Sequence, residues 1–128
     1  MLVEDDDSVN FYNEFLLQDL EVVENIVIRE NGEEALRYLE SCVQDSSMPV
    51  PELIFLDINM PVMNGFEFLE KYDNHPLKET IKALVVMLTT SLHPNDLERA
   101  NAFACVSEYV YKPLMEERIE EILSKYFN

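Results

Sequence analysis

The chain has 128 residues, of which 48% are apolar and only 2 are glycine. This length suits one domain with a sizeable core, and so many apolar residues exclude a disordered segment. The formal net charge of -17 argues against direct binding to nucleic acid or to an anionic membrane, because neutralising phosphate groups requires Lys and Arg.

The chain opens on a strand-like segment and continues into a helix. Residues 1–3 are apolar, so the first strand is either short or begins upstream. An acidic turn follows, and its Asp7 or Ser8 is expected to cap a helix over about 8–19. The expected apolar face of that helix consists of Val9, Tyr12, Phe15, Leu16 and Leu20.

A second strand and helix come before the most informative stretch. The strand is expected over 24–28, and Asn31 then begins a helix with acidic residues in its first turn, where they suit the helix dipole. A loop over 44–52 leads to a third strand over 53–56, which ends at Asp57. The apolar face of the second helix is expected to consist of Ala35, Leu36, Leu39 and Val43.

The next segments include the most continuous apolar run of the chain. A short helix is predicted over 65–72, and the polar stretch 73–82 is expected to be a connection. The apolar run over 83–88 predicts a central strand, which is followed by Thr89. Pro94 suits the first turn of a fourth, weakly amphipathic helix.

A fifth strand over 106–111 ends at Lys112, and a final helix covers 116–127. Five strands therefore alternate with five helices. The strands are continuously apolar, which indicates a sheet covered on both faces, and the alternation indicates parallel strands. We predict one α/β domain with a doubly wound parallel sheet and helices on both faces.

Polar residues follow four of the five strands. Because ligands bind outside the carboxyl ends of strands in an open parallel sheet, we expect these residues to converge. They are Glu4 and Asp5 after the first strand, Asp57 after the third, Thr89 after the fourth and Lys112 after the fifth.

This set of residues suits phosphoryl transfer. Two carboxylates 4 Å apart repel by about 4 kcal/mol at an effective dielectric constant of 20, so one carboxyl group takes up a proton or a hard cation such as Mg²⁺ binds. Lys112 and Thr89 are good partners for phosphate oxygens, and Asp57 is the candidate nucleophile. Each of these residues also has a simpler interpretation when it is considered alone. The acidic turn and Thr89 could be helix caps, and Lys112 could be an exposed turn residue.

The motifs around these residues resemble the receiver domain of two-component response regulators over essentially the whole chain. They are Leu2-Val-Glu-Asp-Asp6, Asp57-Ile-Asn-Met-Pro-Val-Met-Asn-Gly65, Leu88-Thr-Thr90 and Tyr109-Val-Tyr-Lys-Pro113. The resemblance implies a flavodoxin-like (βα)5 fold with strand order 2-1-3-4-5. It also implies a single receiver domain over residues 1–128 with no output domain.

The resemblance further implies a role for each matching residue. Asp57 is the phosphoacceptor, and Thr89 and Lys112 contact the phosphoryl group. The expected Mg²⁺ ligands, with Mn²⁺ as a possible substitute, are Asp57 itself, Asp5, Glu4 through water, and the backbone carbonyl of Asn59. Tyr109 matches an aromatic switch that turns inward when Thr89 moves, and the Lys112–Pro113 peptide bond is expected to be cis.

The implied partners are a histidine kinase or phosphotransfer protein as phosphodonor and an unknown downstream protein. The downstream partner is expected at the face formed by the fourth helix, the fifth strand and the fifth helix. Such a protein catalyses its own phosphorylation and dephosphorylation and is not a turnover enzyme.

Cys42 and Cys105 form no CxxC motif and are interpreted as small buried or half-buried apolar residues in a reducing compartment. With no signal-peptide pattern or membrane-length apolar run, we predict a cytoplasmic protein.

Some features depart from the family pattern and leave other functions to consider. Glu4 stands where Asp is commoner, and the segments 92–96 and 102–106 are unusual; His75 and His93 match no family motif and are interpreted as loop residues. The first rival is a degenerate receiver that binds partners without phosphorylation. The second is a phosphatase, which needs a second acid where this chain has Asn59. A calcium loop at Asp5–Asp7 lacks the Gly and the distal Glu of that motif.

Overall fold

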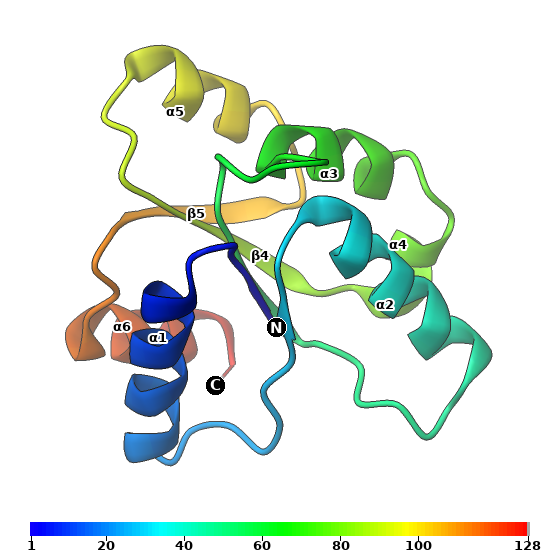
Figure 1. Cartoon of the computed structure of the whole chain (residues 1–128), viewed down its shortest axis with the longest axis horizontal. Helices are drawn as coiled ribbons and strands as arrows, with labels where there is room; N and C mark the ends of the chain where they lie inside the picture. Colours follow the sequence, from blue (N-terminus) through cyan, green and yellow to red (C-terminus); the bar gives the residue numbers. More distant parts are fainter. Residues whose placement is uncertain (128) are drawn as a thin grey trace.

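In the computed structural model, which describes residues 1–127, five parallel strands form one sheet in the order β2-β1-β3-β4-β5 (Figure 1). The strands are β1 (Leu2–Val3), β2 (Ile28–Arg29), β3 (Leu53–Leu56), β4 (Leu84–Thr89) and β5 (Val106–Tyr111). The helices are α1 (Asp7–Asp19), α2 (Gly32–Gln44), α3 (Gly65–Asp73), α4 (Leu77–Ile81), α5 (Pro94–Asn101) and α6 (Glu116–Tyr126).

The helices cover both faces of the sheet, as predicted. Helices α1 and α6 lie on one face, where Leu17, Ile119 and Ile122 pack on β1, β3 and β4. Helices α2, α3, α4 and α5 contribute to the core on the other face, which is the larger of the two. The predicted fold class and strand order are confirmed.

Side-chain caps fix where the first three helices begin. Asp6 has extended backbone angles, and its carboxylate accepts hydrogen bonds from the backbone N–H groups of Ser8 and Val9 at 2.8 and 3.2 Å. The cap of α1 is therefore Asp6, and the prediction of Asp7 or Ser8 was wrong by one or two residues. Asn31 caps α2 as expected, and Asn64 begins α3 with a reciprocal capping box.

The buried face of α1 agrees only in part with the predicted one, of which Val9, Leu16 and Leu20 are half-buried. Leu17, Asn10 and Asn13 are buried, whereas Phe15 is 62% exposed and Tyr12 is 42% exposed. On the buried side of the helix, the Asn10 side chain donates a hydrogen bond to the carbonyl of Glu4 at 2.9 Å. A buried amide with a hydrogen-bond partner is compatible with a core position. The spacing of apolar residues in the sequence does not reveal such a buried polar residue.

The stretch 73–82, predicted as a connection, contains helix α4, so residues 1–127 form six helices where five were expected. Leu77 and Ile81 lie four residues apart on this helix and are both buried. Two other predicted features were also incorrect. Residues 24–27 lie outside β2, and Val43 at the end of α2 is 49% exposed.

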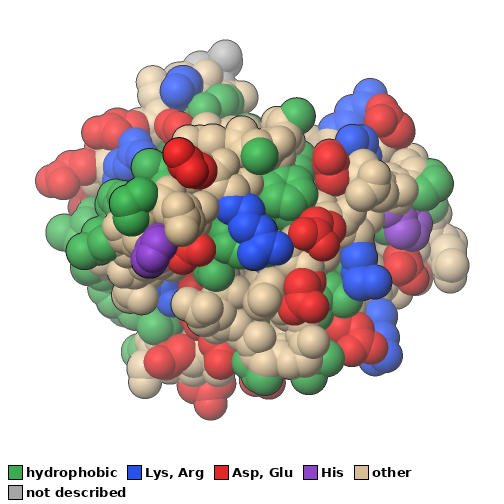
Figure 2. All heavy atoms as spheres, turned by 90° about the horizontal axis from the view of Figure 1, so that it is seen from above, with side chains coloured by type: hydrophobic (Ala, Val, Ile, Leu, Met, Phe, Trp, Pro, Cys, Tyr) green, Lys and Arg blue, Asp and Glu red, His purple; other side chains and the backbone are tan. Residues whose placement is uncertain are grey.

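The acidic residues are spread over the surface and several are paired. In Figure 2, Lys and Arg side chains lie beside Asp and Glu on the face seen from above. Two such pairs join Arg99 to Glu70 at 3.2 Å and Lys78 to Asp73 at 2.9 Å. The high acidic content therefore does not by itself mark a binding face. Within residues 1–127, no helix is long and apolar enough to cross a membrane.

Candidate functional site at the carboxyl edge of the sheet

Asp57 lies directly after β3 and is held by its own backbone. Its N–H donates to the carbonyl of Val3 at 3.0 Å, and its carboxylate accepts from the N–H of Ile58 at 2.8 Å. Only 8% of the residue is exposed. The carboxylate is thus fixed in place at the edge of the core.

Gly65 permits the close return of the loop that follows Asp57. The Gly65 N–H donates to the carbonyl of Ile58 at 2.8 Å. A Cβ atom at Gly65 would lie 2.2 Å from the carbonyl oxygen of Asp57, which is far inside contact distance. The Pro, Asn and Gly residues that follow Asp57 therefore form a turn that only glycine can close at this position.

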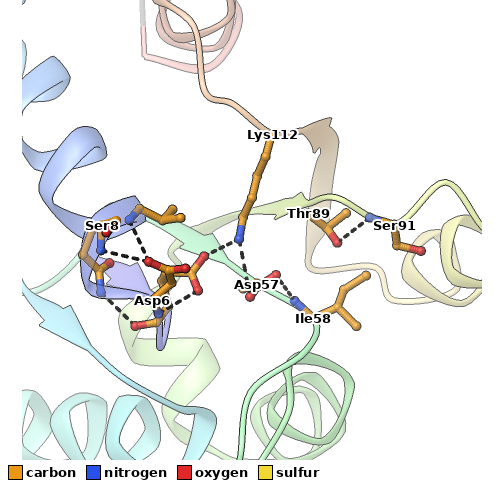
Figure 3. Close-up of polar contacts among 10 residues, drawn as sticks. Asp6, Ser8, Asp57, Ile58, Thr89, Ser91 and Lys112 are labelled. Atoms are coloured by element: carbon orange, nitrogen blue, oxygen red, sulfur yellow. Dashed lines mark hydrogen bonds and ion pairs between the residues drawn. The ribbon is translucent and has the colours of Figure 1, made fainter.

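Lys112 reaches across the edge of the sheet from the end of β5 (Figure 3). Its ammonium group contacts the carboxylate of Glu4 and lies 3.5 Å from Oδ2 of Asp57. Its backbone N–H donates to the carbonyl of Thr89 at 2.8 Å, and the Lys112–Pro113 peptide bond is cis, as expected. A single cation therefore contacts carboxylates that follow two different strands.

Glu4, Asp5 and Asp57 form the acidic cluster that the sequence predicted. One carboxylate oxygen of each lies within 4.8 Å of the others, which is close enough for one cation to contact all three. Asp5 is exposed, whereas Glu4 is only 4% exposed. Carboxylate oxygens at this spacing fit a hard divalent cation such as Mg²⁺.

The protonation of the cluster reflects its burial. Burial raises the pKa of Glu4 to about 7, and the charge of Asp57 adds to this, while the hydrogen bond from Lys112 opposes it. Burial works against the charge on Lys112, but its hydrogen bond to Glu4 and the charge of Asp57 raise the pKa of Lys112 above its usual value. One ammonium among three carboxyl groups leaves an excess of negative charge that a divalent cation would neutralise.

Asn59 lies in the loop two residues after Asp57 and is exposed. Among the described residues, no hydrogen bond engages its carbonyl oxygen, so that oxygen is free to face a ligand. The position is compatible with the expected metal contact. Asn10, which sequence reasoning missed, holds the other side of the site through its bond to the Glu4 carbonyl.

Thr89 is fully buried at the end of β4, next to the site but turned away from the cluster (Figure 3). The pairing of Leu56 with Met87 brings Thr89 to the edge where Asp57 lies. Its hydroxyl oxygen accepts a hydrogen bond from the N–H of Ser91 at 3.0 Å. The hydroxyl accepts this bond and keeps its own hydrogen to donate, and because it is turned away from the cluster, the side chain must rotate to contact a group on Asp57.

Ser91 connects Thr89 to the predicted switch residue, and sequence reasoning gave it no role. Its carbonyl accepts from the hydroxyl of Tyr109 at 3.3 Å, and its own hydroxyl donates to Asp96 in the first turn of α5 at 2.5 Å. One residue thus joins the end of β4, an aromatic side chain of β5 and the beginning of α5. Tyr109 is half-buried and packs edge-to-face on Tyr111.

The two histidines lie at turns, as interpreted. His93 precedes α5 and accepts from the N–H of Asn95 at 3.2 Å, and His75 accepts from the N–H of Leu77 at 3.1 Å. Cys42 is buried and Cys105 half-buried, in agreement with the structural role that the sequence indicated for both.

The strand order, the acidic cluster and the bridging lysine define a class of protein. They are typical of doubly wound α/β domains that bind ligands in the crevice at the carboxyl ends of their strands. Comparison with known proteins narrows this class to a family. A family model described as the response regulator receiver domain matches residues 1–124, so the chain belongs to that family.

Individual relatives support the same assignment. Response regulator Rcp1 from Synechocystis sp. is 30% identical over 97 residues, which cover 76% of this chain and 65% of Rcp1, so the chain spans less than two thirds of that relative. The crystal structure of a two-component response regulator from Cytophaga hutchinsonii is 33% identical, with a TM-score of 0.86, and the match covers 99% of this chain and 94% of the other. The Mn²⁺-bound form of Rcp1 shares the fold at a TM-score of 0.71 and 24% identity, covering 98% and 91% of the two chains.

Receiver domains are signalling modules rather than turnover enzymes. They take phosphate from histidine kinases, bind a divalent metal and signal to downstream partners.

Proposed function

We propose that Asp57 accepts a phosphoryl group from a histidine kinase or phosphotransfer protein in a Mg²⁺-dependent reaction. The observation that carries the proposal is the placement of Asp57. Its carboxylate lies 3.5 Å from the Lys112 ammonium and shares an acidic cluster with Glu4 and Asp5. A nucleophile flanked by an acidic cluster and a phosphate-binding cation is the arrangement that phosphoryl transfer needs.

Glu4, Asp5, Asp57 and the Asn59 carbonyl would hold the metal, for which Mn²⁺ can substitute. A bound Mg²⁺ neutralises charge on the phosphoryl oxygens. The Mn²⁺-bound form of Rcp1, a relative of this chain, supports the choice of metal. Lys112 contacts Glu4 and lies 3.5 Å from Asp57, and we expect its ammonium group to shift from Glu4 toward the phosphoryl group after transfer.

The transfer uses the residues of this chain as follows. An oxygen of Asp57 attacks the phosphorus of a phosphohistidine, the P–N bond breaks, and the donor imidazole leaves with the bonding electron pair and takes up a proton. Lys112 pairs with the phosphoryl oxygens. We expect the side chain of Thr89 to rotate, so that its hydroxyl donates to the phosphoryl group.

The switch then passes through Ser91. Moving Thr89 releases the N–H of Ser91, whose carbonyl and hydroxyl hold Tyr109 and α5. The face formed by α5, β5 and α6 then changes its contacts with a downstream protein. Leu92 is 77% exposed in the loop before α5, and Tyr111 is 47% exposed at the end of β5. To shift the ratio of active to inactive molecules from 1:99 to 99:1, phosphorylation must favour the active state by about 5.5 kcal/mol.

The two free thiols suit a cytoplasmic location.

Intact-mass spectrometry after incubation with acetyl phosphate tests the proposal. The wild-type chain is expected to gain one phosphoryl group in the presence of Mg²⁺ and none in EDTA. Asp57→Asn should gain none, while Asp45→Asn, an exposed control on the loop after α2, should behave as wild type. Equal labelling of Asp57→Asn and wild type refutes Asp57 as the acceptor, and an unlabelled wild type favours a degenerate receiver.

A further inference from the structure

Helix α1 carries a polar residue, Asn13, on the face that packs on the sheet. Asn13 is only 2% exposed. Within residues 1–127, the side-chain hydrogen bonds of α1 are made by Asn10 and Tyr12, and the Asn13 amide makes none. A buried amide without a partner is costly, because it has given up its hydrogen bonds to water. The position of Asn13 therefore calls for a hydrogen-bonding partner.

Asn10 fixes this face of the helix against the acidic cluster. Its amide nitrogen donates to the carbonyl of Glu4 at 2.9 Å, while its Oδ1 atom is buried and has no partner within residues 1–127. Asn10 and Asn13 lie three residues apart and so occupy the same side of α1. Two incompletely paired amides within one helical turn indicate that a further polar group belongs between α1 and the sheet.

A cavity of about 10 Å³ lies between Asn13 and the acidic cluster. Its apolar border consists of Leu2, Val3, Phe55 and Leu88, and its polar border consists of Asn13, Glu4 and Asp57. A space of this size is at the lower limit for one water molecule, so a hydrated metal ion or an organic ligand does not fit. We call this space the Asn13 cavity.

We propose that the Asn13 cavity holds one water molecule that joins Asn13 to the carboxylates of Glu4 and Asp57. The water oxygen accepts a hydrogen bond from the Asn13 amide N–H, and the two O–H groups donate to the two carboxylates. Three hydrogen bonds are the usual number for a buried water molecule. The apolar side chains around it offer no competing partner.

Through this water, Asn13 is a positioning residue for the acidic cluster, and this role rests on the proposed function of the site. Lys112 contacts the carboxylates of Glu4 and Asp57, and the water holds the same two groups from the side of α1. Hydrogen bonds of this kind orient metal ligands, and their loss typically weakens metal binding by about 10–100-fold. Because a water molecule mediates the contact, we expect the lower end of that range.

Replacing Asn13 with leucine separates positioning from packing. Leucine has the branching of asparagine without its polar atoms, and its methyl groups fill the space of the water. The dissociation constant for Mg²⁺, measured by isothermal titration calorimetry, should rise about tenfold. The thermal unfolding temperature in EDTA should equal or exceed that of wild type, because a buried polar group has been removed. A residue needed only for packing would instead lower the unfolding temperature.

Leu17→Met is the matched control, since Leu17 lies four residues further along the same buried face and is 4% exposed. Its affinity for Mg²⁺ should stay at the wild-type value. A crystal structure of the wild-type protein in EDTA, at a resolution that shows ordered water, tests the proposal without any variant. We expect one water within about 3.2 Å of the Asn13 amide nitrogen and of an oxygen of each carboxylate.

Several outcomes overturn the proposal. An Asn13 cavity without water, or a direct hydrogen bond from Asn13 to Oδ1 of Asn10, contradicts the water bridge. Equal affinities of Asn13→Leu and wild type for Mg²⁺ contradict a positioning role. A weaker affinity that accompanies a lower unfolding temperature, or that Leu17→Met shares, traces to packing. A wild-type protein that binds Mg²⁺ but takes no phosphoryl group from acetyl phosphate contradicts the proposed function alone, and the Mg²⁺ affinities still decide the role of Asn13.

Discussion

Replacing Lys112 with methionine should destabilise the metal-free protein in a pH-dependent manner. At 3.5 Å and an effective dielectric constant of 20, the attraction between Lys112 and Asp57 is about 5 kcal/mol before the cost of desolvation. Removing one partner of a buried ion pair typically costs about 3–5 kcal/mol. Glu4, whose pKa is already about 7, can take up a proton and so relieve part of the unbalanced negative charge. We therefore expect the free energy of unfolding at pH 8 to fall by about 3 kcal/mol, the lower end of that range.

The loss should be smaller at pH 5.5. Without Lys112, Glu4 loses the hydrogen bond that holds its pKa down, so the pKa of Glu4 in the folded variant rises further. Glu4 then keeps its proton in the folded variant at pH values above 4.5, where the unfolded chain has released it. Stability of the variant therefore falls as pH rises from about 4.5 through the pKa of folded Glu4, and more steeply than in wild type.

Urea unfolding in EDTA at both pH values measures the two losses. Lys125→Met is the matched control, since that lysine is 62% exposed at the end of α6 and pairs with Glu108 at 3.6 Å; its loss should stay below about 1 kcal/mol at either pH. If Lys112→Met lowers the free energy of unfolding by the same amount at pH 5.5 as at pH 8, the destabilisation does not come from unbalanced charge in the acidic cluster.

Three further substitutions test other parts of the site. Gly65→Ala should cost about 3 kcal/mol or more and lower phosphoryl labelling, because its Cβ would meet the Asp57 carbonyl at 2.2 Å; unfolding that is unchanged in urea contradicts this. Glu4→Gln should remove the decrease in metal-free stability between pH 4.5 and 7, the window set by the raised pKa of Glu4, as measured by unfolding free energy against pH; a slope that persists contradicts the assignment. Asn10→Ala should cost about 1–3 kcal/mol by leaving the Glu4 carbonyl without its partner, and a neutral result in thermal unfolding would show that water replaces the amide.

The positions of the site residues follow from sequence because they depend on strand ends. A continuous apolar run shows where a buried strand stops, and parallel strands stop at one edge of the sheet. That reasoning predicts that Glu4, Asp57 and Lys112 lie together at this edge. The strand order itself came from the family resemblance, since apolar runs do not say which strands are neighbours.

The contacts that sequence reasoning missed are made by backbone atoms or by buried amides. Ser91 joins Thr89 and Tyr109 through its N–H and carbonyl groups, which are common to most residues and leave no side-chain signature. Asn10 is polar but lies on the buried side of α1, where its side chain has a carbonyl partner six residues away. Such partners become visible only when the chain is folded.

Helix α4 was missed for a related reason. Its five residues, Leu77–Ile81, are too few to show a helical period, and their stability depends on packing rather than on propensity. The contact between Lys112 and Glu4 joins residues that lie 108 positions apart in the chain. Such a contact is formed only in the folded site and leaves no local pattern in the sequence.

The central claim is that Asp57 carries the phosphoryl group, and chemical mapping tests it most directly. After incubation with acetyl phosphate and Mg²⁺, borohydride reduces an aspartyl phosphate to homoserine, which tandem mass spectrometry locates in the digested protein. We predict homoserine at residue 57 alone, with its formation abolished by EDTA. Homoserine at another acidic residue, or labelling that survives EDTA at full yield, would contradict the assignment of Asp57 as a metal-dependent phosphoacceptor.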